Sequence, residues 1–119
     1  MVAGLKLVTL RKRAEFLAVA ASGKKWVAPG FILQIGVAHP PTSTIHYGLT
    51  ASSKIGNAVI RNRARRRLRA LAAELMVHAS PEHDYVLIAR VSTAEHAFES
   101  LKEDLLKGLK RMKVWSKEN

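Results

Sequence analysis

Six arginines stand within nine residues of this chain, in the segment Arg61-Asn62-Arg63-Ala64-Arg65-Arg66-Arg67-Leu68-Arg69. No acidic residue follows them until Glu74, so their charges are not neutralised along the sequence. The planar guanidinium group of arginine binds phosphate oxygens through two parallel hydrogen bonds and also stacks on bases. The segment therefore predicts a surface for a polyanion, and it suits RNA better than a cluster of lysines would.

The same segment has the apolar spacing of an amphipathic helix, which we expect to run to about His78. At about 100° per residue, one stripe of the helix carries apolar side chains and the flank carries polar ones. The stripe consists of Ile60, Ala64, Leu68, Leu71 and Leu75. The flank carries Arg61, Asn62, Arg65, Arg66 and Arg69. Such a helix can pack into a core on one side and remain charged on the other.

The net charge of +11 is concentrated in one half of the 119-residue chain. Residues 1–70 hold thirteen Lys or Arg against the single acid Glu15, whereas residues 71–119 hold seven bases and eight acids. A dedicated polyanion surface produces this asymmetry. A merely solvated basic face is the alternative, but solubility does not require the charges to cluster.

Composition excludes several other classes of site. The chain has no cysteine, which excludes disulfides and thiolate metal sites. No apolar run approaches the roughly 18 residues of a membrane span, and the first residues lack the features of a secretory signal, so we expect a cytoplasmic protein that does not bind membranes.

The remaining acids and histidines do not form a recognisable catalytic pattern. Glu95, Glu99 and Glu103 alternate with leucines and lysines, as on a solvated helix face. The five histidines fall in loops, strand edges and helix ends, which favours surface or capping roles over a metal site. We therefore expect no catalytic residue and no metal ligand on the protein.

The pattern of elements predicts a single domain over residues 1–119. We expect a helix over 9–22, strands over 31–37 and 44–52 that pair as a hairpin, the arginine helix, a buried strand over 84–90 and a helix over 92–110. This order, α-β-β-α-β-α, predicts a two-layer α/β sandwich with a mixed sheet. Short flexible basic ends are expected at about 1–8 and 113–119.

Two side chains near the basic segments have more than one interpretation. Asn62 could read a base edge or a 2′-hydroxyl group, or it could brace a loop. Phe16 could be a stacking platform for a base or a core residue, and core residues are the commoner case.

The segment Gly48-Leu49-Thr50-Ala51-Ser52-Ser53-Lys54-Ile55-Gly56-Asn57-Ala58-Val59-Ile60-Arg61-Asn62-Arg63-Ala64-Arg65-Arg66-Arg67-Leu68-Arg69 closely resembles the signature of the bacterial ribonuclease P protein component. Residues 10–23, which include Phe16, resemble the first helix of that family. Residues 31–35 and 84–90 resemble two of its strands. The resemblance covers nearly the whole chain in order.

The resemblance implies the protein subunit of an RNA-based endonuclease that matures the 5′ ends of tRNA. It implies that the RNA performs the chemistry with Mg²⁺ ions, without an organic cofactor on the protein. The implied partners are ribonuclease P RNA and precursor tRNA, with one protein per RNA. It also implies a left-handed strand-helix-strand crossover around the arginine helix, against the usual right-handed rule.

The resemblance also implies roles for particular residues. Six of them would contact the catalytic RNA: Arg61, Asn62, Arg63, Arg65, Arg66 and Arg69. Phe16, Ile32 and Gln34 would line a cleft for the single-stranded 5′ leader of the precursor, and Lys54 would lie beside both surfaces. Ala20 and Gln34 stand where relatives often carry aromatic residues, which implies fewer rings for stacking. His46 and Ser53 likewise replace common basic residues.

Two other functions compete with this interpretation. The first is a ribosome-associated or RNA-chaperone protein of similar architecture with no role in cleavage. The second is DNA binding through the arginine helix, which is weaker because a helix charged this broadly lacks a short face for reading the major groove.

Overall fold

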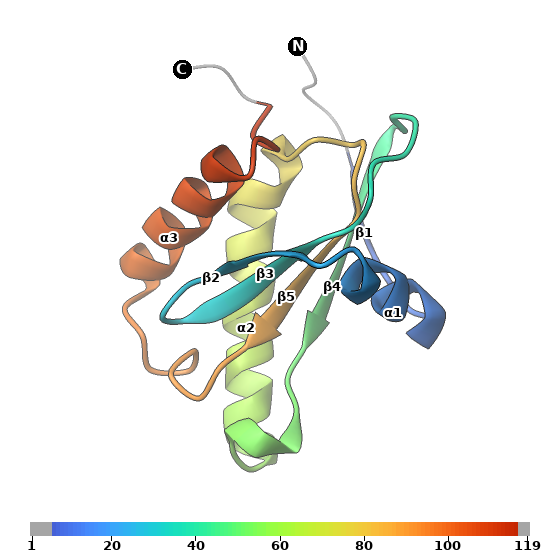
Figure 1. The fold of residues 1–119 in the computed structure, drawn as a ribbon. Coiled ribbons are helices and arrows are strands. Elements are labelled where there is room, and N and C mark those ends of the chain that lie inside the picture. Colours follow the sequence, from blue (N-terminus) through green and yellow to red (C-terminus); the bar gives the residue numbers. More distant parts are fainter. Residues whose placement is uncertain (1–5, 117–119) are drawn as a thin grey trace.

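The computed structural model describes residues 6–116, which form a five-stranded mixed sheet and three α-helices (Figure 1). In chain order the elements are β1 (Lys6–Thr9), α1 (Arg13–Ala21), β2 (Lys24–Val27), β3 (Phe31–Ile35), β4 (Thr44–Thr50), α2 (Ala58–Leu75), β5 (Tyr85–Ala89) and α3 (Phe98–Arg111). Two short 3₁₀ turns, η1 (Ser53–Ile55) and η2 (Met76–His78), flank α2. None of the helices described here is long and apolar enough to cross a membrane.

Strand β5 lies at the centre of the sheet, whose order is β1-β4-β5-β3-β2. It runs parallel to β4 and antiparallel to β3. Tyr85, Val86 and Leu87 are all buried, as expected for a strand covered on both faces. The predicted hairpin of β3 and β4 is therefore wrong, because β5 lies between them.

The sequence prediction missed two edge strands, β1 and β2. Strand β1 pairs in parallel with β4, so residues 6–8 are part of the sheet and not of a flexible arm. Strand β2 pairs antiparallel with β3. Both are four residues long and mostly exposed, so they lack the apolar alternation that reveals a strand. Across the described residues the order is thus β-α-β-β-β-α-β-α.

One face of the sheet and the helices α2 and α3 enclose the main core. In α2, Ala64, Leu68 and Leu71 are fully buried, while Ile60 and Leu75 at the ends of the predicted stripe are half-buried. Burying each leucine contributes roughly 1.5–3 kcal/mol. The other buried side chains of this core include Phe31, Leu33, Ile35, Leu101, Leu105 and Leu109.

Helix α1 covers part of the opposite face of the sheet. Val19 of α1 joins Leu10 and Val86 in a second, smaller apolar cluster, against which Phe16 and Ile88 pack. The expected two layers are therefore present, and α1 adds a partial third layer (Figure 1). The chain passes from β4 through α2 to β5, its parallel neighbour. The left-handed sense of this crossover stays a prediction.

The C-terminal boundaries differ from those expected. Helix α3 begins at Phe98 and not at residue 92, because residues 92–97 form turns. Thr93 is fully buried there, and its hydroxyl donates to the Gly30 carbonyl. Val114 is buried and Trp115 bridges to Ala79, so residues 113–116 are not a frayed tail. The other parts of the two predicted ends, 1–5 and 117–119, lie outside the described residues.

Gly108 of α3 fixes the distance between this helix and β2. A Cβ atom added at Gly108 would overlap the indole ring of Trp26. We expect Gly108→Ala to lower the melting temperature, because overpacking costs about 1–3 kcal/mol and the gain in helix propensity recovers at most about 1 kcal/mol. Gly36→Ala is the matched control, since a Cβ atom added there would lie 3.4 Å from its nearest neighbour, the Asp84 carbonyl oxygen. Equal melting temperatures for the two variants in a thermal scan would contradict this packing.

Candidate nucleic-acid interface

Helix α2 begins at a well-defined cap. The side chain of Asn57 accepts a hydrogen bond from the Ile60 amide at 3.0 Å. Gly56 precedes the cap with φ of 150°, and a Cβ atom there would come within 3.0 Å of Ile60. The arginines follow within one turn of this cap. Since the N-terminus of a helix carries partial positive charge, the arginines add to a field that already attracts anions.

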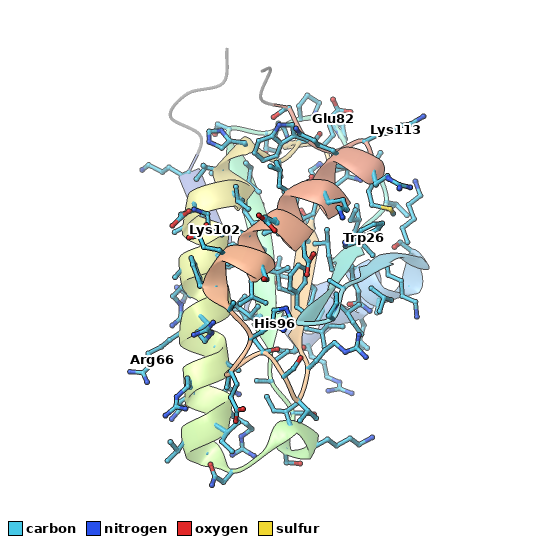
Figure 2. The ribbon with its side chains drawn as sticks, turned by 90° about the vertical axis from the view of Figure 1, so that its left-hand side faces the viewer. Trp26, Arg66, Glu82, His96, Lys102 and Lys113 are labelled. Carbon is cyan, nitrogen blue, oxygen red and sulfur yellow. The ribbon has the colours of Figure 1, made fainter. Side chains whose placement is uncertain are left out.

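Four of the predicted RNA-binding residues meet in one shallow depression on the exposed flank of α2. It is lined by Val59, Asn62, Arg65, Arg66 and Arg69. Figure 2 shows Arg66 extending from α2 away from α3. Within residues 6–116, the side chains of Arg61, Arg63, Arg66 and Arg69 make no hydrogen bond or ion pair. Their donors are therefore available to a ligand.

Arg65 is held in place by two contacts. Its Nη1 donates to Oδ1 of Asn62 and its Nη2 to the Ala51 carbonyl, both at 3.3 Å. Asn62 thus braces the Arg65 side chain of its own helix and not a loop, while its contact with a base edge or a 2′-hydroxyl group stays a prediction. A guanidinium group has five N–H donors, so Arg65 keeps donors for a phosphate while its orientation is fixed.

Arg67 points to the other flank and is not part of this surface. It donates to the His96 carbonyl, and its guanidinium group lies 5.9 Å from the ring centroid of Phe98. Arg63 is one helical turn before Arg67 and shares that flank. Arg61 and Arg63 therefore fan out to different sides of α2, so the predicted set does not form one flat patch.

The predicted cleft residues share the sheet face that α1 partly covers. Phe16 packs so closely on Gly48 of β4 that a Cβ atom there would overlap its ring. Ile32 and Gln34 are half-exposed, and they pair in register with Ile88 and Val86 of β5. Phe16 is half-buried, so its ring both joins the small cluster and borders the open part of this face.

Further apolar side chains on this face were not predicted. Val27 of β2 pairs with Ile32 and is 54% exposed, and Leu17 of α1 is also 54% exposed. Ile88 is half-exposed on the same face. The sequence pattern that could have predicted this wider face is the alternation of Lys25 and Val27 in β2. That pattern covers only four residues, so it does not identify a strand unless the pairing with β3 is known.

Lys54 connects the two surfaces through the order of the chain. Strand β4 contributes Gly48 to the cleft face, η1 carries the exposed Lys54, and α2 follows at once. The Ser52 side chain accepts from the Lys54 amide at 3.3 Å, which fixes this turn. Along the chain, Lys54 therefore stands between the strand of the cleft face and the arginine helix, and its position beside both surfaces stays a prediction.

Two titratable groups with shifted pKa values serve the fold. Glu15, the one acid in the basic half, accepts hydrogen bonds from the amides of Lys12 and Arg11 at 2.9 Å, and these bonds lower its pKa. Its carboxylate closes the N-terminus of α1 and pairs with no arginine. Burial raises the pKa of Tyr85, whose hydroxyl donates to the Ser80 carbonyl at 2.7 Å. Among the described residues, no group of three His, Cys, Asp or Glu side chains is placed to hold a metal.

The Phe16–Gly48 contact offers a test of the cleft. We expect Gly48→Ala to displace Phe16 from β4, with a loss of about 1–3 kcal/mol in the free energy of unfolding. Urea denaturation measures this loss, and fluorescence quenching of a fluorophore attached at position 17 reports movement of α1. The Gly36→Ala control meets a side chain of the same helix, Val19, at an ordinary 3.5 Å. An unchanged unfolding energy in Gly48→Ala would contradict the close approach.

Comparisons with known proteins agree with this architecture. The family model described as ribonuclease P matches residues 6–113. The ribonuclease P protein component of Paramagnetospirillum magneticum is 48% identical over 111 residues, which cover 90% of this chain and 84% of the relative. That of Erythrobacter litoralis is 44% identical over 108 residues, covering 89% and 86%.

Solved structures show the same fold. The RNase P protein from Staphylococcus aureus superposes with a TM-score of 0.72 at 24% identity, covering 93% of each chain. The RNase P protein from Thermotoga maritima gives 0.67 at 25% identity, covering 87% of this chain and 96% of its own. The chain therefore belongs to the ribonuclease P protein component family and is a protein subunit of that endoribonuclease.

Proposed function

We propose that the protein binds ribonuclease P RNA through the exposed flank of α2 and holds the 5′ leader of precursor tRNA on the sheet face beside α1. The RNA then cleaves the precursor at the mature 5′ end. The observation that carries this proposal is the unpaired arginine flank directly after the turn that leaves the cleft face. The family comparisons do not support the alternative of a ribosomal or chaperone protein without a role in cleavage.

The arginine flank fits a folded RNA backbone. Within residues 6–116 the guanidinium groups of Arg66 and Arg69 have no hydrogen-bond partner, and the Asn62 side chain holds Arg65 beside them. Bidentate hydrogen bonds to phosphate are charge-assisted and strong. Each phosphate neutralised in this way releases counterions, so binding should weaken steeply with salt. Arg61 and Arg63, which fan out to either side of α2, would contact neighbouring segments of the same RNA.

The cleft face fits a single strand. Unpaired bases stack on aromatic rings and pack on apolar side chains, which duplex bases do not do. Phe16 supplies one ring, while Ile32, Ile88 and the exposed Val27 supply a flat apolar floor. Ala20 and Gln34 add no rings, so leader affinity would depend on Phe16 and on the lysines at the rim, Lys25 and Lys54.

The protein's share in catalysis would be charge neutralisation and positioning. We propose that Mg²⁺ ions held by the RNA activate the attacking water and stabilise the leaving oxygen. The protein would bring the leader and the catalytic RNA together, with one protein per RNA. Because the arginines offset part of the phosphate repulsion, the complex should need less Mg²⁺ than the RNA alone.

Reconstitution tests this function. Purified protein with its cognate RNA should cleave precursor tRNA at low Mg²⁺ at least ten-fold faster than the RNA alone, which corresponds to about 1.4 kcal/mol of barrier. The stimulation should shrink when the leader is shortened to one nucleotide, because the cleft then has no strand to hold. A single-turnover assay with gel separation measures both. Equal rates with and without protein would disprove the proposal, and equal stimulation for both leader lengths would disprove the leader cleft.

A further inference from the structure

We propose that a second basic surface, formed by β2 and the C-terminal part of α3, binds another segment of ribonuclease P RNA. This inference rests on the proposed function and adds a second contact to it. The surface carries Lys24, Lys107, Lys110, Arg111 and Lys113. In Figure 2, Trp26 marks this surface on one side of α3 and Arg66 marks the arginine flank on the other.

The contact between Trp26 and Gly108 brings these bases together from segments about 80 residues apart. The indole ring of Trp26 lies against the helix backbone at Gly108. Lys24 is two residues before Trp26 in the same strand and shares its face, because side chains alternate along a strand. Lys107 comes one residue before Gly108, and Arg111 comes three residues after it. Both are exposed on α3.

The bases of this surface form no ion pair within the described part of the chain. Among residues 6–116, the ion pairs are His39–Asp84 and the two pairs that Lys102 makes with Glu74 and Glu99. None of the five bases takes part in them. Glu103 and Asp104 stand four and three residues before Lys107 on the same helix, but neither forms an ion pair with it.

Local roles explain the individual bases but not their gathering. Bases in the last turn of a helix interact favourably with its dipole, and lysines protect an edge strand from pairing with other chains. Neither role requires the two sets to adjoin each other. Their placement around one contact is what makes a continuous surface for phosphates.

Lys113 gives independent support, because its backbone is strained. Its φ is 62°, in the left-handed region that favours glycine. Lys113 occupies the position after the C-cap of α3. Its amide donates to the Lys110 carbonyl, and the Val114 amide donates to the Leu109 carbonyl. Glycine usually stands at this position of the motif. A lysine there costs stability that glycine would not cost, which points to a use for its charge.

The surface fits the phosphate backbone of a folded RNA more closely than a single strand or an acidic peptide. Its charges are mostly lysines, which bind phosphates as point charges without reading bases. It offers no exposed aromatic ring for unstacked bases, since Trp26 packs on α3. The molecule measures 39 × 33 × 23 Å, so a folded RNA can contact this surface and the arginine flank with two separate segments.

The test is the salt dependence of binding to ribonuclease P RNA, measured with the full chain and the double variant Lys107→Ala/Arg111→Ala. If both bases contact phosphates, the log–log slope should fall by about 1.4–1.8, since each contact contributes about 0.7–0.9. Lys102→Ala is the matched control on the same helix, because Lys102 already pairs with Glu74 at 2.9 Å. An unchanged slope in the double variant would overturn the proposal. An unchanged slope together with lost binding of poly-glutamate would assign the surface to an acidic protein instead.

A second variant separates binding from folding. Lys113→Gly should keep or raise the melting temperature, because glycine relieves the strain, and yet it should weaken RNA binding at low salt by two-fold or more. Unchanged affinity would remove Lys113 from the surface.

Failure of the proposed function would give a different result, since the wild-type protein would then not stimulate cleavage. If only the second surface is wrong, the wild type still stimulates and the double variant binds RNA like the wild type.

Discussion

Helix α2 must hold six arginines against the sheet without a single ion pair to any of them among the described residues. Like charges at i, i+4 positions, such as Arg61 with Arg65 and Arg65 with Arg69, cost a few tenths of a kcal/mol each. Burying Leu68 or Leu71 contributes roughly 1.5–3 kcal/mol. The free energy from burying the apolar stripe therefore exceeds the cost of the repulsion. The helix stays folded, and its arginines remain available to a ligand.

The contacts around α2 direct that charge. Arg65 is tied to Ala51 at the end of β4, and Arg67 is tied to the turn before α3. One arginine thus fixes the helix to the cleft side, and another fixes it to the α3 side. The other two helices are placed by close contacts at glycines. Phe16 of α1 packs on Gly48 of β4, and Trp26 of β2 packs on Gly108 of α3. The result is a rigid body whose basic surfaces have fixed positions relative to one another.

Sequence patterns predicted the elements whose periodicity is long and strong. The stripe of α2, the alternation of β3 and the fully apolar β5 were confirmed, because each follows from local burial. The pairing of strands was not predictable in the same way. Strand β5 enters between β3 and β4 from more than 30 residues away, and short exposed edge strands such as β1 carry no pattern of their own.

The candidate site was predictable in composition but not in arrangement. The sequence identified the arginine flank, yet the roles of Arg65 and Arg67 depend on tertiary neighbours, the Ala51 and His96 carbonyls, that no local pattern names. Likewise, the adjacency of β2 and the end of α3 depends on one packing contact between Trp26 and Gly108. The sequence-based boundaries failed where such long-range contacts hold the chain, at residues 6–8 and 113–116.

The proposed function requires the exposed arginines of α2 to contact RNA phosphates. The direct measurement is the salt dependence of binding between ribonuclease P RNA and the full chain, with wild type and Arg66→Ala compared. Arg66 makes no hydrogen bond or ion pair within the described part of the chain, so its removal should leave the melting temperature nearly unchanged. We expect the log–log slope to fall by about 0.7–0.9, the contribution of one phosphate contact. An unchanged slope with intact folding would contradict the account.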